Sequence, residues 1–293
     1  MYTERRYGQV SVLHAENGGV VPYGNTVVVR GADATLIVDP SLTLDTDPVG
    51  ADLVMISHAH EDHLAGLRHF DVAVHAHEAD AAAVASIEAL FAQYGLDPAD
   101  RAEMERYVRS EYGIEDRRDG VEGFTDGHVF DLGGRTATVI ALPGHTPGHC
   151  GLLIEPDGFL YVADIDLTSF GPMYGDLHSS VDDFLTSLDR VEGIDARWYG
   201  TFHQKGVIDG AADFRHRLGQ YRAKLLSRED RLLEFLDRPR SVADIVDHRL
   251  VYRPHVQAPW VTPVERRTAQ LHLERLLRAE QIVVDDDGRY RRS

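Results

Sequence analysis

The chain contains very little cysteine and very little lysine. Cys150 is its only cysteine, and Lys205 and Lys224 are its only lysines. A single cysteine excludes an intrachain disulfide and a thiolate-rich zinc site, so any metal would have to be bound by histidine and carboxylate side chains.

Long hydrophobic runs are also missing. No stretch reaches the roughly 18 uninterrupted apolar residues that a membrane-spanning helix needs. The first residues, MYTERRYGQV, include two arginines but no following apolar stretch and no small-residue cleavage site, so a secretory signal is not expected. The sequence therefore predicts a cytoplasmic protein without a membrane partner.

Basic residues are few relative to acidic ones, and they are unevenly distributed. The chain has 30 basic and 48 acidic residues, a net charge of −18, which disfavours indiscriminate attraction to phosphate backbones. Residues 213–293 contain 17 basic and 13 acidic residues, a net of +4, whereas residues 1–212 have a net charge of −22. Together with a length of 293 residues, this predicts a large domain at 1–212 and a small module at 213–293.

Short β-branched runs bounded by turn residues predict the strands of a buried sheet in the first part. A helical stretch interrupts them at Asp80–Glu111, within an insertion of about residues 80–120, and breaks near Leu96-Asp97-Pro98. A further helix is predicted at Val181–Val191. The predicted strands are NTVVVRG, ATLIVDP, ADLVMIS, HVFDLGG, TATVIALP, CGLLIE, FLYVADI and ARWYGTF.

The last part changes to helical periodicity. Helices are predicted at Phe214–Leu236, Ser241–Leu250 and Thr262–Glu280, with SVAD and TPVE as amino-terminal caps of the last two. The segment QIVVDDDGRYRR then predicts a hairpin that turns at Asp287-Gly288. Helices followed by a hairpin are typical of a winged-helix-like module.

The densest group of potential metal ligands directly follows the apolar strand LVMIS. It contains His58, His60, Asp62 and His63 within six residues. Imidazole and carboxylate ligands suit zinc, iron or manganese, and a loop at the end of a buried strand can direct neighbouring side chains into one crevice. The alternative is a polar surface loop that happens to be rich in histidine.

Three later strands end in the same kinds of residue. His145 lies in the turn PGHTPGH, Asp164 ends FLYVAD, and His203 follows ARWYGTF. Any one of them alone would be a cap or a structural residue, but their order after the first cluster favours a shared metal site. Asp166, just beyond Asp164, is the alternative carboxylate.

The pattern HxHxDH, a Gly-His turn, a strand-terminal Asp and a strand-terminal His resembles the metallo-β-lactamase superfamily over about residues 10–210. The resemblance implies an α/β fold, an αββα sandwich with the site at one edge between the two sheets. It also implies that one metal is bound by His58, His60 and His145, the other by Asp62, His63 and His203, with Asp164 bridging both and Asp39 supporting the ligands. This chain departs from the family where Ala163 stands in place of the usual glycine before the bridging carboxylate.

A pair of divalent cations implies hydrolytic chemistry. Two ions about 3.5 to 4 Å apart would lower the pKa of a bridging water toward 7 and polarise a carbonyl or phosphoryl oxygen. Zinc is the expected metal, with iron and manganese as alternatives. Asp62 would also orient the resulting hydroxide or relay its proton.

Three functions fit these observations. The first is hydrolysis of a small ester, thioester or lactone, which the acidic catalytic domain favours. The second is phosphodiester cleavage by an endoribonuclease of this type, and the third is an iron-dependent oxidoreductase. We expect a small-molecule substrate, RNA as the less favoured ligand, and a chain that is compatible with a homodimer.

Overall fold

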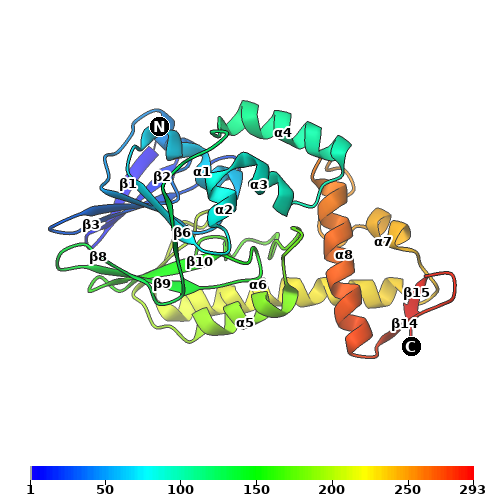
Figure 1. The fold of residues 1–293 in the computed structure, drawn as a ribbon. Coiled ribbons are helices and arrows are strands. Elements are labelled where there is room, and N and C mark those ends of the chain that lie inside the picture. The colour runs from blue at the N-terminus through cyan, green and yellow to red at the C-terminus, as the bar shows by residue number, and fades with distance from the viewer. Residues whose placement is uncertain (1) are drawn as a thin grey trace.

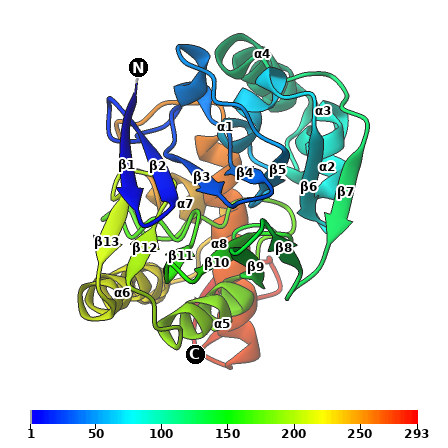
Figure 2. The ribbon, with the colours of Figure 1, turned by 90° about the vertical axis from the view of Figure 1, so that its left-hand side faces the viewer.

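The computed structural model describes residues 2–293 and contains two β-sheets that face each other. Helices cover the outer face of each sheet, so the layers follow the order helix, sheet, sheet, helix (Figures 1 and 2). The predicted αββα sandwich is therefore confirmed.

The first sheet has seven strands that lie side by side in chain order. β1 to β4 are antiparallel and β4 to β7 are parallel. The parallel strands β4 and β5 are buried almost throughout, as expected for a sheet covered on both faces. The strands are β1 (Tyr2–Tyr7), β2 (Val10–Ala15), β3 (Thr26–Arg30), β4 (Thr35–Val38), β5 (Leu53–Ile56), β6 (Ala73–His77) and β7 (Val121–Phe124).

The second sheet has six strands in the order β13-β12-β11-β10-β9-β8, and only β11 and β12 run parallel. Its inner face packs on the first sheet through side chains such as Leu152 and Phe159, which contact the cluster around Val12 and Met55. The strands are β8 (Val129–Asp131), β9 (Thr136–Ala141), β10 (Cys150–Glu155), β11 (Phe159–Tyr161), β12 (Trp198–Gly200) and β13 (Val207–Asp209).

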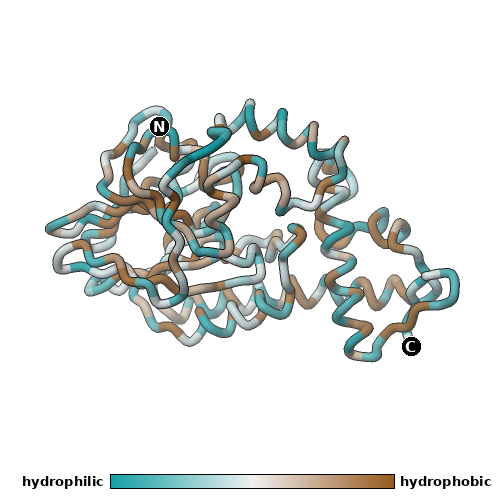
Figure 3. Tube along the Cα trace, in the orientation of Figure 1, coloured by the Kyte–Doolittle hydropathy of each residue, from teal (hydrophilic) through white to brown (hydrophobic). Residues whose placement is uncertain are grey.

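The predicted helical stretch at residues 80–111 forms three helices, α2 (Ala81–Ala85), α3 (Ile87–Gln93) and α4 (Pro98–Tyr112). The predicted break is confirmed, because Asp97 caps α4 by accepting hydrogen bonds from the amides of Ala99 and Asp100. The break between α2 and α3 was not predicted; Ser86 adopts an extended backbone there. Figure 3 shows that α4 is mostly hydrophilic, whereas the strands of the sandwich are hydrophobic.

Two helices cover the second sheet, α5 (Val181–Glu192) and the long α6 (Ala211–Phe235). The first half of α6 packs on the sheet through Phe214 and Leu218, and its end packs through Leu232 in a separate hydrophobic cluster. Since α6 belongs to both clusters, the division at residues 212 and 213 stays a prediction. No helix within residues 2–293 is long and apolar enough to cross a membrane.

The last segment contains α7 (Val242–His248), α8 (Val261–Arg278) and the hairpin of β14 (Ile282–Val284) and β15 (Tyr290–Arg292). The hairpin is thus confirmed, and the winged-helix interpretation stays a prediction. Ser241 and Asp244 form the predicted capping box of α7.

The predicted TPVE cap of α8 is wrong. The helix begins at Val261, and no side chain caps its first turn. The Glu265 carboxylate instead accepts hydrogen bonds from the backbone amides of Leu250, Val251 and Tyr252, because the preceding chain folds back against α8.

Candidate metal centre

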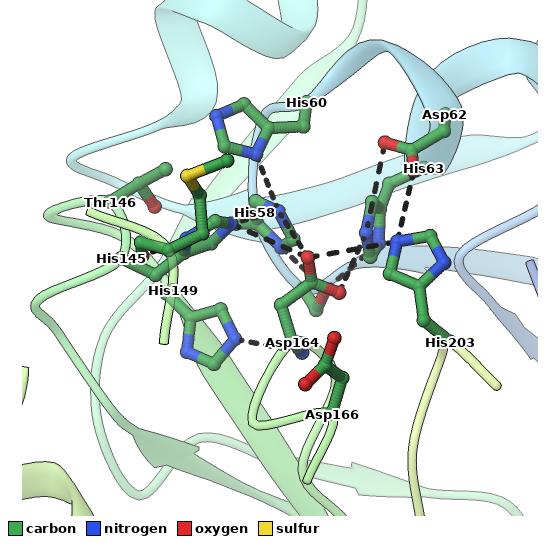
Figure 4. Close-up of polar contacts among 12 residues, drawn as sticks. His58, His60, Asp62, His63, His145, Thr146, His149, Asp164, Asp166 and His203 are labelled. Atoms are coloured by element: carbon green, nitrogen blue, oxygen red, sulfur yellow. Dashed lines mark hydrogen bonds and ion pairs between the residues drawn. The ribbon is translucent and has the colours of Figure 1, made fainter. Parts of the chain in front are cut away.

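All seven predicted ligands lie together at one edge of the sandwich (Figure 4). They come from loops and turns that follow strands of both sheets. His58 and His60 follow β5, and Asp62 and His63 lie in the short helix α1 (Glu61–Leu64). His145 lies between β9 and β10, Asp164 follows β11, and His203 follows β12.

Three imidazoles form the first group of candidate ligands. The Nε2 atom of His58 lies 3.0 Å from Nδ1 of His60 and 3.1 Å from Nε2 of His145. Three converging imidazole nitrogen atoms can bind a divalent metal ion.

The second group combines a carboxylate with two imidazoles. His203 Nε2 lies 3.1 Å from Asp62 Oδ2, and His63 Nε2 lies 4.0 Å from Asp62 Oδ1. One ligand atom from each of these three residues lies within 4.8 Å of the other two, so the three atoms could bind one metal ion.

Asp164 lies between the two groups, as Figure 4 shows. One of its oxygens is 3.1 Å from His63 Nε2, and the other is 3.5 Å from His145 Nε2 and 3.8 Å from His203 Nε2. Asp166 instead accepts hydrogen bonds from the amide and hydroxyl of Thr168. The geometry therefore favours Asp164 over Asp166 as a carboxylate shared by two ions.

Each candidate imidazole is held by an oxygen atom through the nitrogen that faces away from the cluster. Such contacts fix the orientation of the ring and leave the other nitrogen free for a metal. The contacts are His58 with Ser57 Oγ at 3.1 Å, His60 with Asp176 Oδ2 at 2.7 Å, His63 with Asp39 Oδ2 at 3.0 Å, His145 with Met173 O at 2.8 Å and His203 with Gly19 O at 2.9 Å.

Asp39 is the buried anchor of this arrangement. Its carboxylate accepts hydrogen bonds from the Ser57 amide at 2.7 Å, the Ser57 hydroxyl at 2.6 Å and the Tyr161 hydroxyl at 2.7 Å. It also faces His63, which places it where the resemblance predicts a supporting carboxylate.

Two further properties fit a cation. His63 Nε2 and Asp164 Oδ1 are buried and lie 3.1 Å apart, but neither makes a well-aligned hydrogen bond among residues 2–293. Burial disfavours the charged form of His63, but Asp39, Asp164 and Asp62 outweigh burial and raise its pKa well above the ordinary value. Burial is likewise outweighed by carboxylates at His203 and His60, whose pKa values rise to about 9. Carboxylates therefore stabilise positive charge at His60, His63 and His203, whereas burial lowers the pKa values of His58 and His145 and keeps these rings neutral, as a metal ligand must be.

His149 serves the site without facing either group of ligands. Its Nδ1 donates to the Leu142 carbonyl, and its Nε2 accepts a hydrogen bond from the Asp164 amide at 3.2 Å. Burial and the neighbouring His145 lower the pKa of His149 to about 3, so the ring is neutral and remains an acceptor.

The backbone is unusual on either side of the candidate ligands. Asp39, Ala163 and Gln204 have φ angles of 49°, 46° and 45°, in the left-handed region that favours glycine. Ala163, which stands where the family usually has glycine, therefore has a left-handed backbone conformation. Left-handed residues cluster at functional sites, where the surrounding structure stabilises them.

Asp80 is a buried carboxylate that the sequence analysis assigned only to a helical stretch. It accepts hydrogen bonds from the amide of Ala59 at 3.0 Å, the hydroxyl of Thr146 at 2.7 Å and the amide of Gly148 at 2.8 Å. A Cβ atom at Gly148 would lie 2.5 Å from Asp80 Cγ, so this turn requires glycine. Asp80 thus joins the loop of His58 to the loop of His145.

Three other polar residues, His178, His69 and Tyr174, do not belong to the groups of candidate ligands. His178 is exposed and does not line the pocket, and His69 pairs with Asp45 at 2.8 Å. Tyr174 is buried and contacts His272 Nε2 through its hydroxyl at 3.0 Å.

A pocket of about 410 Å³ opens beside the candidate ligands. His60, Asp62, His145, Asp164 and His203 form part of its wall. Its volume lies in the usual range for a small-molecule site, roughly 300–1,000 Å³.

Asp176 was missed by sequence reasoning because no strand or motif marks it. Replacing it with asparagine should weaken metal binding by about 10- to 100-fold, since the carboxylate orients His60 and increases its basicity. Competition with a chromogenic chelator measures the effect. Asp183→Asn, at an exposed carboxylate of α5, is the matched control, and equal affinities in the two variants would contradict the assignment.

Helix α6 holds the loop that carries Met173 and Asp176. The buried Arg228 donates hydrogen bonds to the carbonyls of Phe170 and Pro172. Arg228→Met should lower the free energy of unfolding by about 3 kcal/mol, because it leaves both carbonyls without their charged donor. It should also weaken metal binding, whereas Arg266→Met on the exposed face of α8 should change neither. Urea unfolding and chelator competition test this, and metal affinity that survives the loss of stability would show that the loop acts independently.

Known proteins share this sequence pattern and fold. A curated relative, the Beta-lactamase-like protein 2 homolog of Caenorhabditis elegans, is 27% identical over 148 residues, which are 50% of this chain and 46% of that protein. The match thus spans about half the length of this relative.

Two solved structures have the same fold along almost the whole chain. A metallo-beta-lactamase family protein from Thermus thermophilus has a TM-score of 0.73 at 21% identity, covering 97% of this chain and 99% of that one. A beta-lactamase domain protein from Burkholderia ambifaria has a TM-score of 0.72 at 22% identity, covering 100% of this chain and 94% of that one. The sequence profile of the Metallo-beta-lactamase superfamily matches residues 19–203, and the chain therefore belongs to this superfamily.

Proposed function

We propose that the protein is a dinuclear metal-dependent hydrolase that cleaves a small ester, thioester or lactone. The observation that carries this proposal is the convergence of seven imidazole and carboxylate groups, five of which line the pocket. Members of the superfamily are generally metal-dependent hydrolases.

In this proposal His58, His60 and His145 hold one ion, and Asp62, His63 and His203 hold the other. Asp164, which lies between the two groups, would serve both ions. When bound, the ions would act as Lewis acids on the scissile carbonyl and lower the pKa of a water molecule between them.

The side chains around the ions keep this arrangement fixed during a reaction. Asp62 lines the pocket, so in addition to its role as a ligand it would orient the nucleophilic water or relay its proton. Asp39 and Asp176 hold the rings of His63 and His60, and His149 holds the backbone of Asp164. A preorganised site of this kind needs little rearrangement when charge develops on the substrate.

The charge of the pocket supports a small substrate rather than a polyanion. Among the residues that the structure describes, neither lysine nor arginine lines the pocket, whereas five carboxylates do. Bound ions would contact a scissile phosphoryl group, but the neighbouring phosphates of RNA would find no lysine or arginine in the pocket to pair with.

Phosphodiester cleavage is the second candidate, since residues 213–293 have a net charge of +4 and could attract RNA from outside the pocket. An iron-dependent oxidation is the third candidate. A mononuclear iron that reacts with oxygen needs open coordination positions, so seven ligands for two ions favour hydrolysis over oxidation.

Comparative assays rank these candidates. Purified protein would be tested on p-nitrophenyl esters, thioesters and lactones, alongside bis(p-nitrophenyl) phosphate and single-stranded RNA. The proposal expects esters, thioesters or lactones to have the highest kcat/KM, with activity lost in His60→Ala and kept in His178→Ala. Preferred cleavage of the phosphodiester or RNA, or oxygen consumption with bound iron, would reject it.

A further inference from the structure

The pocket has two chemically different sides. Polar groups of the candidate metal centre form one side. The other side is apolar and aromatic, and it consists mainly of Leu96, Met104, Tyr107, Phe170, Tyr252 and Trp260.

Segments outside the two sheets build this apolar wall. Met104 and Tyr107 belong to α4, and Tyr252 and Trp260 precede α8. The two segments meet where the rings of Tyr107 and Trp260 lie 5.3 Å apart, and Tyr252 packs on Phe170 at 5.5 Å. The wall is thus separate in the chain from the candidate metal ligands.

The wall is held in place by buried polar contacts. The Glu265 carboxylate accepts hydrogen bonds from the backbone amides of residues 250 to 252, which fixes the position of Tyr252. Arg228 holds the Phe170 carbonyl at 2.9 Å. A preformed apolar surface binds an apolar ligand without first having to be ordered.

Charge restricts what can lie against this wall. Glu61, Asp62, Asp164, Asp166 and Asp176 line the pocket, and no arginine or lysine within residues 2–293 does so. Bound ions would balance Asp62 and Asp164, but Glu61, Asp166 and Asp176 would still repel a carboxylate or phosphate held away from the ions, and no cationic side chain would pair with it. Transfer of an uncharged apolar group from water to the aromatic surface lowers the free energy of the complex.

We propose that the pocket binds an uncharged, apolar acyl group, and that Tyr107, Tyr252 and Trp260 determine which acyl chains it accepts. This inference rests on the proposed hydrolase function and specifies the substrate class for that same site.

Binding is measured apart from hydrolysis with straight-chain amides from butanamide to octanamide, which are uncharged. Trp260 is one of two tryptophans, and the other, Trp198, packs on Tyr7 in the sandwich and does not line the pocket. Trp198→Phe therefore leaves Trp260 as the fluorescent reporter. We expect Kd to fall about fourfold for each added methylene, the factor that corresponds to ~0.8 kcal/mol, until the wall is covered.

Substitutions in the wall identify the residues responsible. Tyr107→Ala and Tyr252→Ala should flatten the dependence of Kd on chain length, whereas Tyr290→Ala, at a tyrosine of the terminal hairpin outside the pocket, should not. Val264→Phe, which fills part of the pocket without adding a tryptophan, should reduce the longest chain that binds and keeps the test informative if an alanine variant does not fold. Chain-length dependence that is absent in the folded Trp198→Phe protein, or unchanged in all three wall variants, overturns the proposal.

Parallel assays with p-nitrophenyl esters of two to eight carbons separate this proposal from the hydrolase function. Amides that bind more tightly with length while no ester is cleaved would support the acyl site and reject the hydrolase. Esters cleaved at the same kcat/KM for every chain length would support the hydrolase and overturn the acyl site.

Discussion

Asp164→Asn is expected to lower kcat/KM on the best ester substrate by about 10³-fold or more. Metal ions contribute several kcal/mol of transition-state stabilisation, and each 1.4 kcal/mol or so corresponds to a factor of about ten. The asparagine amide offers one neutral oxygen where the carboxylate offers two charged ones, so it cannot serve both groups of ligands. Its backbone amide still reaches His149, and the local fold should persist.

Asp166→Asn is the matched control, since Asp166 lies two residues along the same loop and lines the same pocket. Its contacts with Thr168 are local, and we expect its substitution to change kcat/KM by about tenfold at most. Metal content and steady-state kinetics of both variants decide the matter. An inactive Asp166→Asn enzyme beside an active Asp164→Asn enzyme would reverse the assignment of the shared carboxylate.

Asp39→Asn should lower the free energy of unfolding by about 3 to 5 kcal/mol, the cost of breaking a buried charged network. The carboxylate accepts three hydrogen bonds and faces His63, and an amide NH₂ in its place would point at donors. Asparagine tolerates the left-handed backbone at this position, so the loss would come from the hydrogen bonds and not from strain.

Urea unfolding with and without a chelator measures this effect. The control is Asp52→Asn, because Asp52 is an exposed carboxylate that accepts one hydrogen bond, from the Thr35 amide. We expect less than about 1 kcal/mol for the control. Equal losses in the two variants would mean that Asp39 does not anchor the site.

Local patterns and the family resemblance together predicted the candidate ligands. His58 to His63 form one short motif, and His145, Asp164 and His203 each follow a strand whose apolar residues are visible in the sequence. Because these strands end at one edge of the sandwich, chain order together with the family resemblance brought the groups together.

Contacts between distant segments could not be predicted in this way. Asp176 and His60 are separated by 116 residues, and nothing near Asp176 marks it as a partner of a histidine. Asp80 was assigned to a helix, although its side chain joins two loops of the site. Glu265 was predicted to cap its own helix, but it binds the amides of an earlier turn, since tertiary packing outweighed the local motif.

The aromatic wall of the pocket could not be predicted from the sequence either. Tyr107 lies on a mostly hydrophilic helix, and Trp260 lies in the segment before α8, more than 150 residues later. Only packing of the two segments against each other brings these rings to the same pocket.

The dinuclear centre is tested most directly by the metal content of the chain, purified without added metal and then dialysed against limiting zinc. Elemental analysis should give close to two ions per chain for the unmodified protein, and clearly fewer for His60→Ala and Asp164→Asn. A chain that remains folded and retains no ions, or the same number in all three proteins, would contradict the proposed dinuclear centre.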